Sequence, residues 1–330
     1  MSRKAGWIAL GLLLAAETAC GRAVKQEAGL EAGKQAYEAS DYAKAAELLQ
    51  TAANADPGNA EIQLWLTRAY YELHEHDLAI NSAEKAVKID PSNSSYHEWL
   101  GRAYGLKAEH SGWMSALGWA KKTRKEFLTA VNLDGKNFAA RQALVEYDCS
   151  VPGIAGGGED RAAAEIAEIA ALDPAEGHYA AGNCRRQKKD FAAADGEFDK
   201  ALRGQPRSSD LIYDIGDYAL KRNQAERLIE VADAGERVNA NDPRGKFYRG
   251  AALVLNNQRS DEAERLLRDY LKRAPTRTAY PRPTVARYWL GRLLQQQGKS
   301  SEAANEYEAA LKLDPKNKAA QEALKKVRKG

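Results

Sequence analysis

The sequence predicts an all-α solenoid of about eight helix–turn–helix units, closed by one further helix at the C-terminus. Composition gives the first indication, because the 330 residues are 44% hydrophobic but include only 5 Phe and 2 Met. Ala, Leu and Tyr therefore carry the apolar faces, and small apolar residues favour closely packed helices. The second indication is a recurring proline, and the third is a set of similar helical segments that end at it.

Five segments share this pattern of small residues seven apart followed by a closing proline: 41–57, 77–91, 190–206, 260–275 and 300–315. The spacing from Pro57 to Pro91 is 34 residues, a length typical of helix-pair repeats. Proline suits this position because it lacks an N–H and fixes φ where one helix stops and a turn begins. Eight units close in this way, at Pro57, Pro91, Gly135 (in the place of proline), Pro174, Pro206, Pro243, Pro275 and Pro315.

Glycine recurs at one position of the first helix in most units. Two antiparallel helices approach most closely where a side chain is smallest, so these positions let one helix sink into the next. The residues are Gly33, Gly101, Gly182, Gly216 and Gly291. Larger residues of the second helices fill the spaces between, namely Leu49, Phe127, Phe198, Leu267 and Tyr307. The sixth unit is the least regular.

From about Gln26 onwards, this combination of small and large positions resembles the tetratricopeptide repeat family. The resemblance implies a right-handed superhelical solenoid over residues 26–315. Residues 316–330 form one more helix without a successor, which we expect to cap the last apolar face.

The N-terminus has the features of an export signal. Ser2-Arg3-Lys4 is basic, and the apolar run 5–16 is shorter than the roughly 20 residues that span a bilayer. Residues 1–19 are predicted to be a signal peptide and residues 20–25 a linker, so that the protein is exported. Cys20 is a candidate for lipidation by its resemblance to bacterial lipoprotein signals, although Glu17 departs from their pattern. Ordinary cleavage and an uncleaved anchor stay open as alternatives.

Two cysteines remain, Cys149 and Cys184, without any CxxC spacing. An oxidising compartment permits a disulfide between them. Both lie on apolar helical stretches, however, which favours buried free thiols.

In the family that the chain resembles, the first helix of each unit lines a concave groove. Carried over by position, the groove has a basic stripe and a ladder of tyrosines, both residue types that anchor interfaces. Packing is the alternative role of the tyrosines. The predicted groove residues are Lys34, Arg68, Arg102 and Arg292, with Tyr179, Tyr213, Tyr248 and Tyr288. The basic residues favour an acidic or extended peptide segment as partner.

Two neighbouring units exceed the regular length. Gly135 follows Pro91 by 44 residues, and Pro174 follows Gly135 by 39. The first insertion is predicted to extend a helix N-terminally, with Ser111 as its N-cap, and the second is a glycine-rich loop over 151–158. Together they form a rim whose candidate partner-binding residues are Trp113, Met114, Trp119 and Ile154. The alternative is that the loop packs on the helix and buries both tryptophans.

No feature of the sequence predicts an enzyme or a cofactor. It has no nucleophile motif and no glycine-rich dinucleotide loop, and His74 and His76 lack an apparent third metal ligand. A net charge of +3 is too balanced to indicate nucleic acid. The sequence therefore predicts a non-catalytic scaffold that binds other proteins in the bacterial cell envelope, periplasmic or lipid-anchored at Cys20. The alternative function is small-molecule or glycan binding, with or without catalysis, by residues 111–119 and 151–158.

Overall fold

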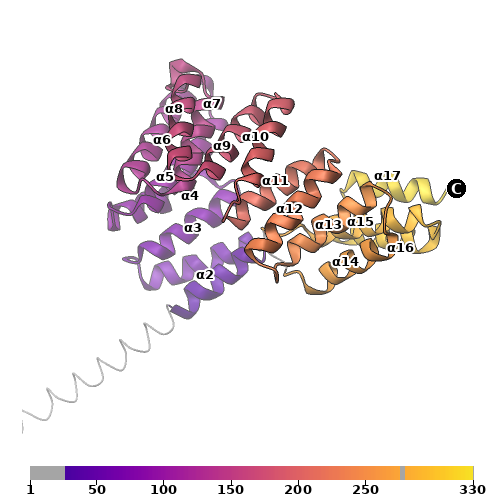
Figure 1. The fold of residues 1–330 in the computed structure, drawn as a ribbon. Coiled ribbons are helices and arrows are strands. Elements are labelled where there is room, and N and C mark those ends of the chain that lie inside the picture. The colour runs from indigo at the N-terminus through magenta and orange to yellow at the C-terminus, as the bar shows by residue number, and fades with distance from the viewer. Residues whose placement is uncertain (1–26, 276–278, 330) are drawn as a thin grey trace, which may run out of the picture. The chain divides into compact units, whose positions relative to one another are not determined.

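The computed structural model describes residues 27–275 and 279–329, and within them the regular structure is helical, with no strand (Figure 1). Residues 27–38 form a helix that α2 follows. The remaining elements, in chain order, are α2 (Tyr42–Ala55), α3 (Ala60–Glu72), α4 (His76–Ile89), α5 (Ser94–Glu109), α6 (Trp113–Leu133), α7 (Phe138–Ser150), η1 (Gly153–Ala155), α8 (Glu159–Leu172), α9 (Pro174–Gln187), α10 (Phe191–Arg203), α11 (Ser209–Lys221), α12 (Ala225–Val238), α13 (Pro243–Leu255), α14 (Ser260–Arg273), α15 (Pro283–Gln296), α16 (Ser300–Leu313) and α17 (Lys318–Val327).

Across the described ranges these helices make eight consecutive pairs, beginning with the helix 27–38 and α2 and ending with α15 and α16. The last helix, α17, has no partner after it and packs on α15 and α16. The predicted helical repeat solenoid with a closing helix is therefore confirmed. The least regular unit in the sequence, the sixth, is an ordinary pair formed by α11 and α12.

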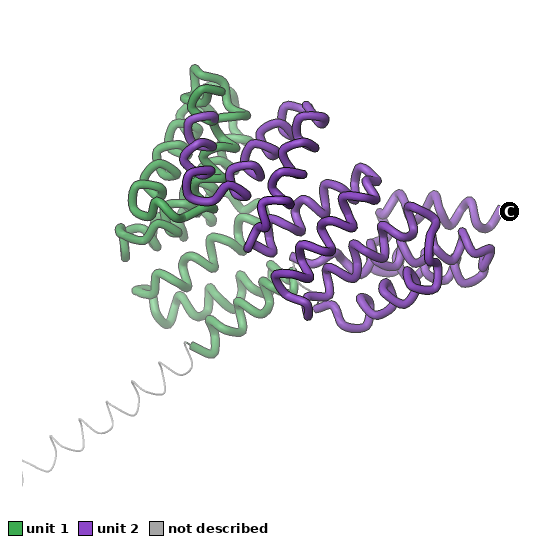
Figure 2. Tube along the Cα trace, viewed as in Figure 1, with its two compact units in different colours: residues 1–162 green, residues 163–330 purple. Residues whose placement is uncertain are grey.

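The chain divides into two compact units, one ending at Ala162 and the other beginning at Ala163 (Figure 2). In unit 1, each helix from α2 to α6 packs on its successor, and the first helices α3, α5 and α7 also pack on one another in turn. Unit 2 repeats this arrangement with α11, α13, α15 and α17. Contacts with only the nearest elements are the mark of a repeat protein, in which each unit buries the apolar face of the one before.

The recurring glycines lie where the helices of a pair touch. A Cβ added at Gly101 would come 2.6 Å from the Phe127 ring, and one at Gly291 would come 2.5 Å from the Tyr307 ring. A Cβ at Gly33 would likewise collide with Leu49. Since no real Cβ tolerates such distances, the small residue is required for the helices to pack this closely. The steric role predicted for these glycines is confirmed.

The two insertions lie in unit 1, on α6 and on the loop that follows α7. The helix α6 has 21 residues against 14 in α2 and α4, so its first turns extend beyond its neighbours. Its N-cap is Gly112, without a side-chain cap. Ser111 instead donates its hydroxyl to the Lys107 carbonyl at the end of α5. The predicted Ser111 cap is therefore wrong, because that side chain closes the preceding helix.

Cys149 and Cys184 are both disulfide-bonded. The expectation of free thiols is therefore wrong for both, since an apolar helical setting does not distinguish a buried thiol from a bonded one. Residues 1–25, with the predicted signal peptide, Cys20 and the linker, lie outside the described residues. Among the helices that are described, none combines the length and apolar character needed to cross a bilayer.

Candidate functional site

The first helices of unit 1 bring three predicted groove cations next to two tryptophans. Arg68 lies on α3 with its guanidinium 4.5 Å from the Trp65 ring and 4.9 Å from the Trp99 ring of α5. Arg102 lies 5.5 Å from Trp99, and the Lys34 ammonium lies 5.8 Å from Trp65. Cations and rings thus alternate across three consecutive first helices. We name this set Lys34, Trp65, Arg68, Trp99 and Arg102 the Trp–Arg ladder.

The sequence places the ladder through a simple spacing. Trp65 and Arg68 are three residues apart on α3, as are Trp99 and Arg102 on α5, so each pair lies on one face of its helix. Because α3 and α5 pack side by side, Arg68 fits between the two rings. Each cation–π contact contributes about 0.5–2 kcal/mol, depending on how far it is desolvated.

The three cations of the ladder differ in what neutralises them. The Lys34 ammonium contacts Glu31 at 2.9 Å and Glu61 at 2.7 Å. Arg102 donates to Glu98 at 2.9 Å. These two positions are therefore already paired with carboxylates of the chain itself.

Arg68 is held by stacking and keeps hydrogen-bonding capacity. Its Nε is buried without a hydrogen-bond partner. Burial also lowers the pKa of the Arg68 guanidinium from its usual value, which reports how far the charge is removed from water. A planar guanidinium with unspent donors between two aromatic faces suits a carboxylate ligand, because that ligand would satisfy the orphaned donor and the charge together.

The predicted tyrosine ladder has a different role. Tyr213 and Tyr248 are only 3% and 1% exposed and stack on each other with ring centroids 5.5 Å apart. Tyr248 donates its hydroxyl to Asp217 at 2.7 Å, and Tyr179 donates to Asp214 at 3.0 Å. Tyr213 and Tyr248 therefore belong to the core of unit 2 and not to a groove surface. Their position on the first helix of the repeat packs against the neighbouring first helix, as the stacking of the two rings shows.

The fourth predicted groove cation, Arg292, lies in unit 2 on α15. Its guanidinium is 4.5 Å from the Trp289 ring and 6.0 Å from the Tyr288 ring. Trp289 is buried in the core, and Tyr288 is partly buried against it. Arg292 therefore makes, within its own helix, the same kind of cation–aromatic contact as the Trp–Arg ladder does.

The structure separates the predicted rim residues into two groups. Trp113, Met114 and Ile154 are 76%, 73% and 78% exposed, so each of these apolar side chains is open to solvent. Trp119 instead packs 5.5 Å from Tyr104 and lies under the Lys122 ammonium at 4.3 Å.

The glycine-rich loop is fastened beside α6. Tyr147 donates to the Ala155 carbonyl at 2.7 Å, and the Gly158 N–H donates to the Asp148 carbonyl at 2.8 Å. The Asp148 carboxylate accepts two hydrogen bonds from Arg124 of α6. The loop is therefore bonded to the end of α7, and its residues Gly153–Ala155 contact α6, as the packing alternative expected, but it leaves Trp113 uncovered.

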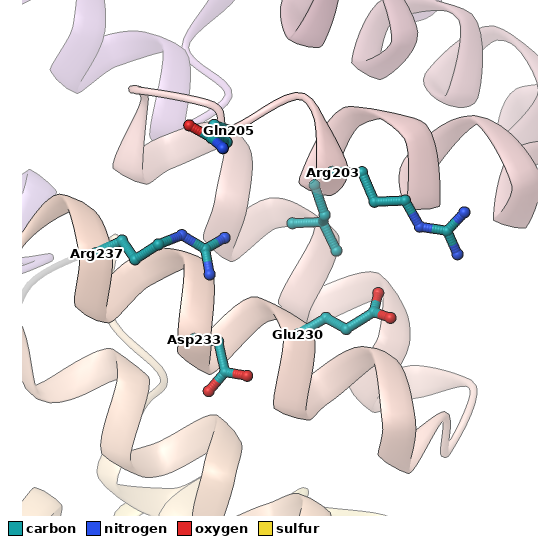
Figure 3. Close-up of a pocket in the computed structure, with 6 residues that line it drawn as sticks. Arg203, Gln205, Glu230, Asp233 and Arg237 are labelled. Atoms are coloured by element: carbon teal, nitrogen blue, oxygen red, sulfur yellow. The ribbon is translucent and has the colours of Figure 1, made fainter.

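Unit 2 contains a cavity of about 330 Å³ between the end of α10 and the middle of α12 (Figure 3). Its lining has two arginines and two acidic residues, so it presents no net charge to a ligand. Asp233 is also paired with Arg249 at 2.6 Å. The lining residues are Leu202, Arg203, Gln205, Glu230, Asp233 and Arg237.

Successive helix pairs with glycine contacts define the class of the molecule, which is a helical repeat protein. Two family models described as tetratricopeptide repeat match the chain, one over residues 36–103 and one over residues 285–317. The chain therefore contains tetratricopeptide repeats over these residues. Repeats of this family generally serve as scaffolds that bind other proteins, and helix pairs continue through the described part of this chain.

Solved structures that match parts or most of the chain include other repeat proteins. A tetratricopeptide repeat protein from Parabacteroides merdae is 12% identical over 92% of this chain and 99% of its own, with a TM-score of 0.40. A thermophilic repeat protein from Thermus thermophilus is 14% identical over 92% and 98%, with a TM-score of 0.34. The O-GlcNAc transferase of Thermobaculum terrenum is 21% identical over 50% of this chain but only 26% of its own, with a TM-score of 0.35. No curated protein matches the sequence.

Proposed function

We propose that the protein is a non-catalytic scaffold of the bacterial cell envelope and binds an acidic, extended segment of a partner protein on the Trp–Arg ladder. The observation that carries this proposal is Arg68, stacked between Trp65 and Trp99 with its Nε buried and unpartnered. The neighbouring cations already have carboxylate partners, so Arg68 is the central anchor.

An acidic segment suits the ladder for two reasons. A carboxylate can take a two-point hydrogen bond from a guanidinium, and that bond is strong where water is partly excluded. The rings of Trp65 and Trp99 give the same segment apolar area, and tryptophan and arginine are the residue types that dominate binding energies at protein interfaces. Affinity is then concentrated at a few positions on α3 and α5.

The envelope location rests on the sequence, with support from the cysteines. The basic and apolar runs of residues 2–16 suit an export signal, and Cys20 is a site for lipid attachment. The bonded state of Cys149 and Cys184 suits an oxidising compartment, in which disulfides persist. We expect partners among other envelope proteins for this reason.

The rim provides a second contact surface for a protein partner. Trp113 and Met114 are adjacent on the first turn of α6, and large apolar residues that are this exposed are typical of interaction sites. The openness of the same residues counts against the alternative function in binding a small molecule or glycan. That function requires Trp113 and the loop to enclose a ligand, whereas Trp113 and Ile154 both face solvent.

Peptide binding tests the role of the ladder. Fluorescence anisotropy would compare a labelled, extended peptide rich in Asp and Glu with the same peptide carrying Lys in their place. We expect only the acidic peptide to bind, and Arg68→Ala to weaken it about tenfold or more, since hydrogen bonds to charged groups contribute about 1.5–3 kcal/mol. Arg265→Ala, which removes an exposed arginine of α14, is the matched control and should bind as wild type does.

The comparison with Arg68→Lys separates charge from geometry. Lysine keeps the positive charge but loses the planar fork, so we expect it to bind more weakly than wild type. Unchanged circular dichroism and Tm would show that each variant is folded. Equal binding of the acidic peptide by wild type and folded Arg68→Ala would refute the proposed role of the ladder.

A further inference from the structure

Three histidines meet where α3 and α5 end and α4 begins, and none of them belongs to the Trp–Arg ladder. His74 lies in the turn after α3, His76 is the first residue of α4, and His110 is the C-cap of α5. One ligand atom from each side chain lies within 4.8 Å of the other two. Only His74 and His76 are neighbours in the sequence. The packing of α4 on α5 brings His110 to them.

Hydrogen bonding leaves these imidazoles available as ligands. The Nδ1 of His110 lies 2.9 Å from the Leu106 carbonyl, which only accepts, so Nδ1 carries the proton and Nε2 keeps its lone pair. This is the arrangement that orients metal-binding histidines, whose second nitrogen donates to a backbone carbonyl. His76 provides an independent indication, because its Nε2 is buried without a hydrogen-bond partner. A buried polar atom of this kind is costly unless a ligand satisfies it.

The electrostatic surroundings tolerate a cation. The site lies at the C-terminal ends of α3 and α5, whose carbonyl ends carry partial negative charge, and at the N-terminal end of α4, with α6 beginning three residues after His110. The ammonium of Lys107, three residues before His110, pairs with Asp77 at 2.8 Å. The rings of His76 and His110 lie 4.3 Å apart, which keeps both near the point where an ion would sit.

We propose that His74, His76 and His110 bind a divalent transition-metal ion, for which zinc is the probe. Imidazole nitrogen is a preferred donor for zinc, copper and nickel, whereas calcium and magnesium require oxygen. Zinc–nitrogen bonds of about 2.0–2.1 Å place tetrahedral ligand atoms about 3.4 Å apart, so the cluster needs to contract by about 1.4 Å or less. The exposed side chain of His74 supplies that movement by a change of rotamer.

The bound ion would have a structural effect. It would fasten the α3–α4 turn to the end of α5, and three residues beyond His110 the exposed Trp113 begins α6. Three protein ligands leave a fourth coordination position, which water or a carboxylate can take. Metal binding thereby would order the part of unit 1 from which the rim projects.

Calorimetric titration of the tag-free, full-length protein with zinc chloride tests this site. We expect a single zinc ion per chain, no heat with magnesium chloride, and a rise of Tm in the presence of zinc. His110→Ala should weaken zinc binding at least tenfold and abolish the rise in Tm. His74→Asn should do the same, and asparagine is chosen because position 74 has a φ of 58°, which asparagine tolerates.

The matched control is His178→Ala, which removes a histidine of α9 that is paired with Glu197 and lies outside the cluster. It should bind zinc as wild type does. Circular dichroism confirms that the variants fold. The absence of zinc binding by folded wild-type protein, or zinc binding that His110→Ala and His74→Asn leave unchanged, would overturn the proposal.

Discussion

Substitution of Gly182 by alanine tests the steric basis of the repeat. Gly182 lies on α9, and an added Cβ would come 2.5 Å from Cε1 and 2.6 Å from Cδ1 of the Phe198 ring on α10. Phe198 is fully buried, so the ring has no free space into which to move. Overpacking of this kind costs about 1–3 kcal/mol. Alanine regains about 1 kcal/mol of helix propensity, so we expect a net loss of up to about 2 kcal/mol.

Gly196 provides a matched control in the same helix pair. It lies on the exposed side of α10, and a Cβ added there meets nothing within 4 Å. Gly196→Ala should therefore stabilise the protein by up to about 1 kcal/mol through helix propensity alone. The same chemical change is thus predicted to have opposite signs at two positions of one repeat.

Urea unfolding monitored by circular dichroism measures both effects as shifts of the transition midpoint. A double-mutant cycle with Phe198→Leu locates the clash, because the smaller side chain leaves room for the new methyl group. In that background Gly182→Ala should cost less than it does in the wild type. If Gly182→Ala stabilises as much as Gly196→Ala, or if Phe198→Leu does not reduce its cost, the steric explanation fails.

Two further predictions concern charged groups. Arg124→Ala removes the guanidinium that donates to Asp148, whose side chain is 1% exposed. It should destabilise unit 1 by about 3 kcal/mol in urea unfolding, because a buried carboxylate is left without its ion-pair partner. A loss below about 0.5 kcal/mol would show that the pair is dispensable. Burial opposes ionisation of Asp195, but hydrogen bonds from Gln224 and Tyr218 outweigh it and lower the pKa of this carboxyl below its usual 3.8. The contribution of the Asp195 carboxylate to stability is therefore complete above the unfolded pKa and is lost as pH falls through the folded pKa. Asp195→Asn should consequently show a smaller fall in Tm between about pH 6 and pH 3 than the wild type does. An equal fall in Tm in the two proteins would contradict this assignment.

The fold was accessible from the sequence because its determinants are local and repeated. Pro57 and Pro91 mark the repeat length, and the glycine and large residues of each pair recur at fixed positions. The structure brings these predicted residues together, as Gly101 meets Phe127 and Gly182 meets Phe198. The N-cap of α6 was mistaken because Ser111 suits either the start of one helix or the end of another.

The candidate site was only partly accessible, because its geometry depends on neighbouring helices. Lys34, Arg68 and Arg102 follow from their repeat position, but the sandwich of Arg68 requires Trp65 and Trp99 from two helices. A tryptophan three residues before an arginine in consecutive first helices is the signal that would have found it.

Burial and long-range approach account for the remaining differences. Tyr213 and Tyr248 occupy a position that serves either a groove or a core, and only the structure places them in the core. His110 is far from His74 in the chain, so its approach is invisible without the packing of α4 on α5.

The most direct test of the central claim is capture of the native partner. Cells producing a C-terminally tagged protein would be crosslinked, and envelope fractions of wild type, Arg68→Ala and a Trp113→Ala, Met114→Ala double variant would be compared. We predict that a partner with an acidic segment is captured from the envelope by wild type, is lost with folded Arg68→Ala, and is retained at least in part by the rim variant. Recovery of the same partner in equal amount with Arg68→Ala, or recovery of the wild-type protein without any crosslinked neighbour, would contradict the account.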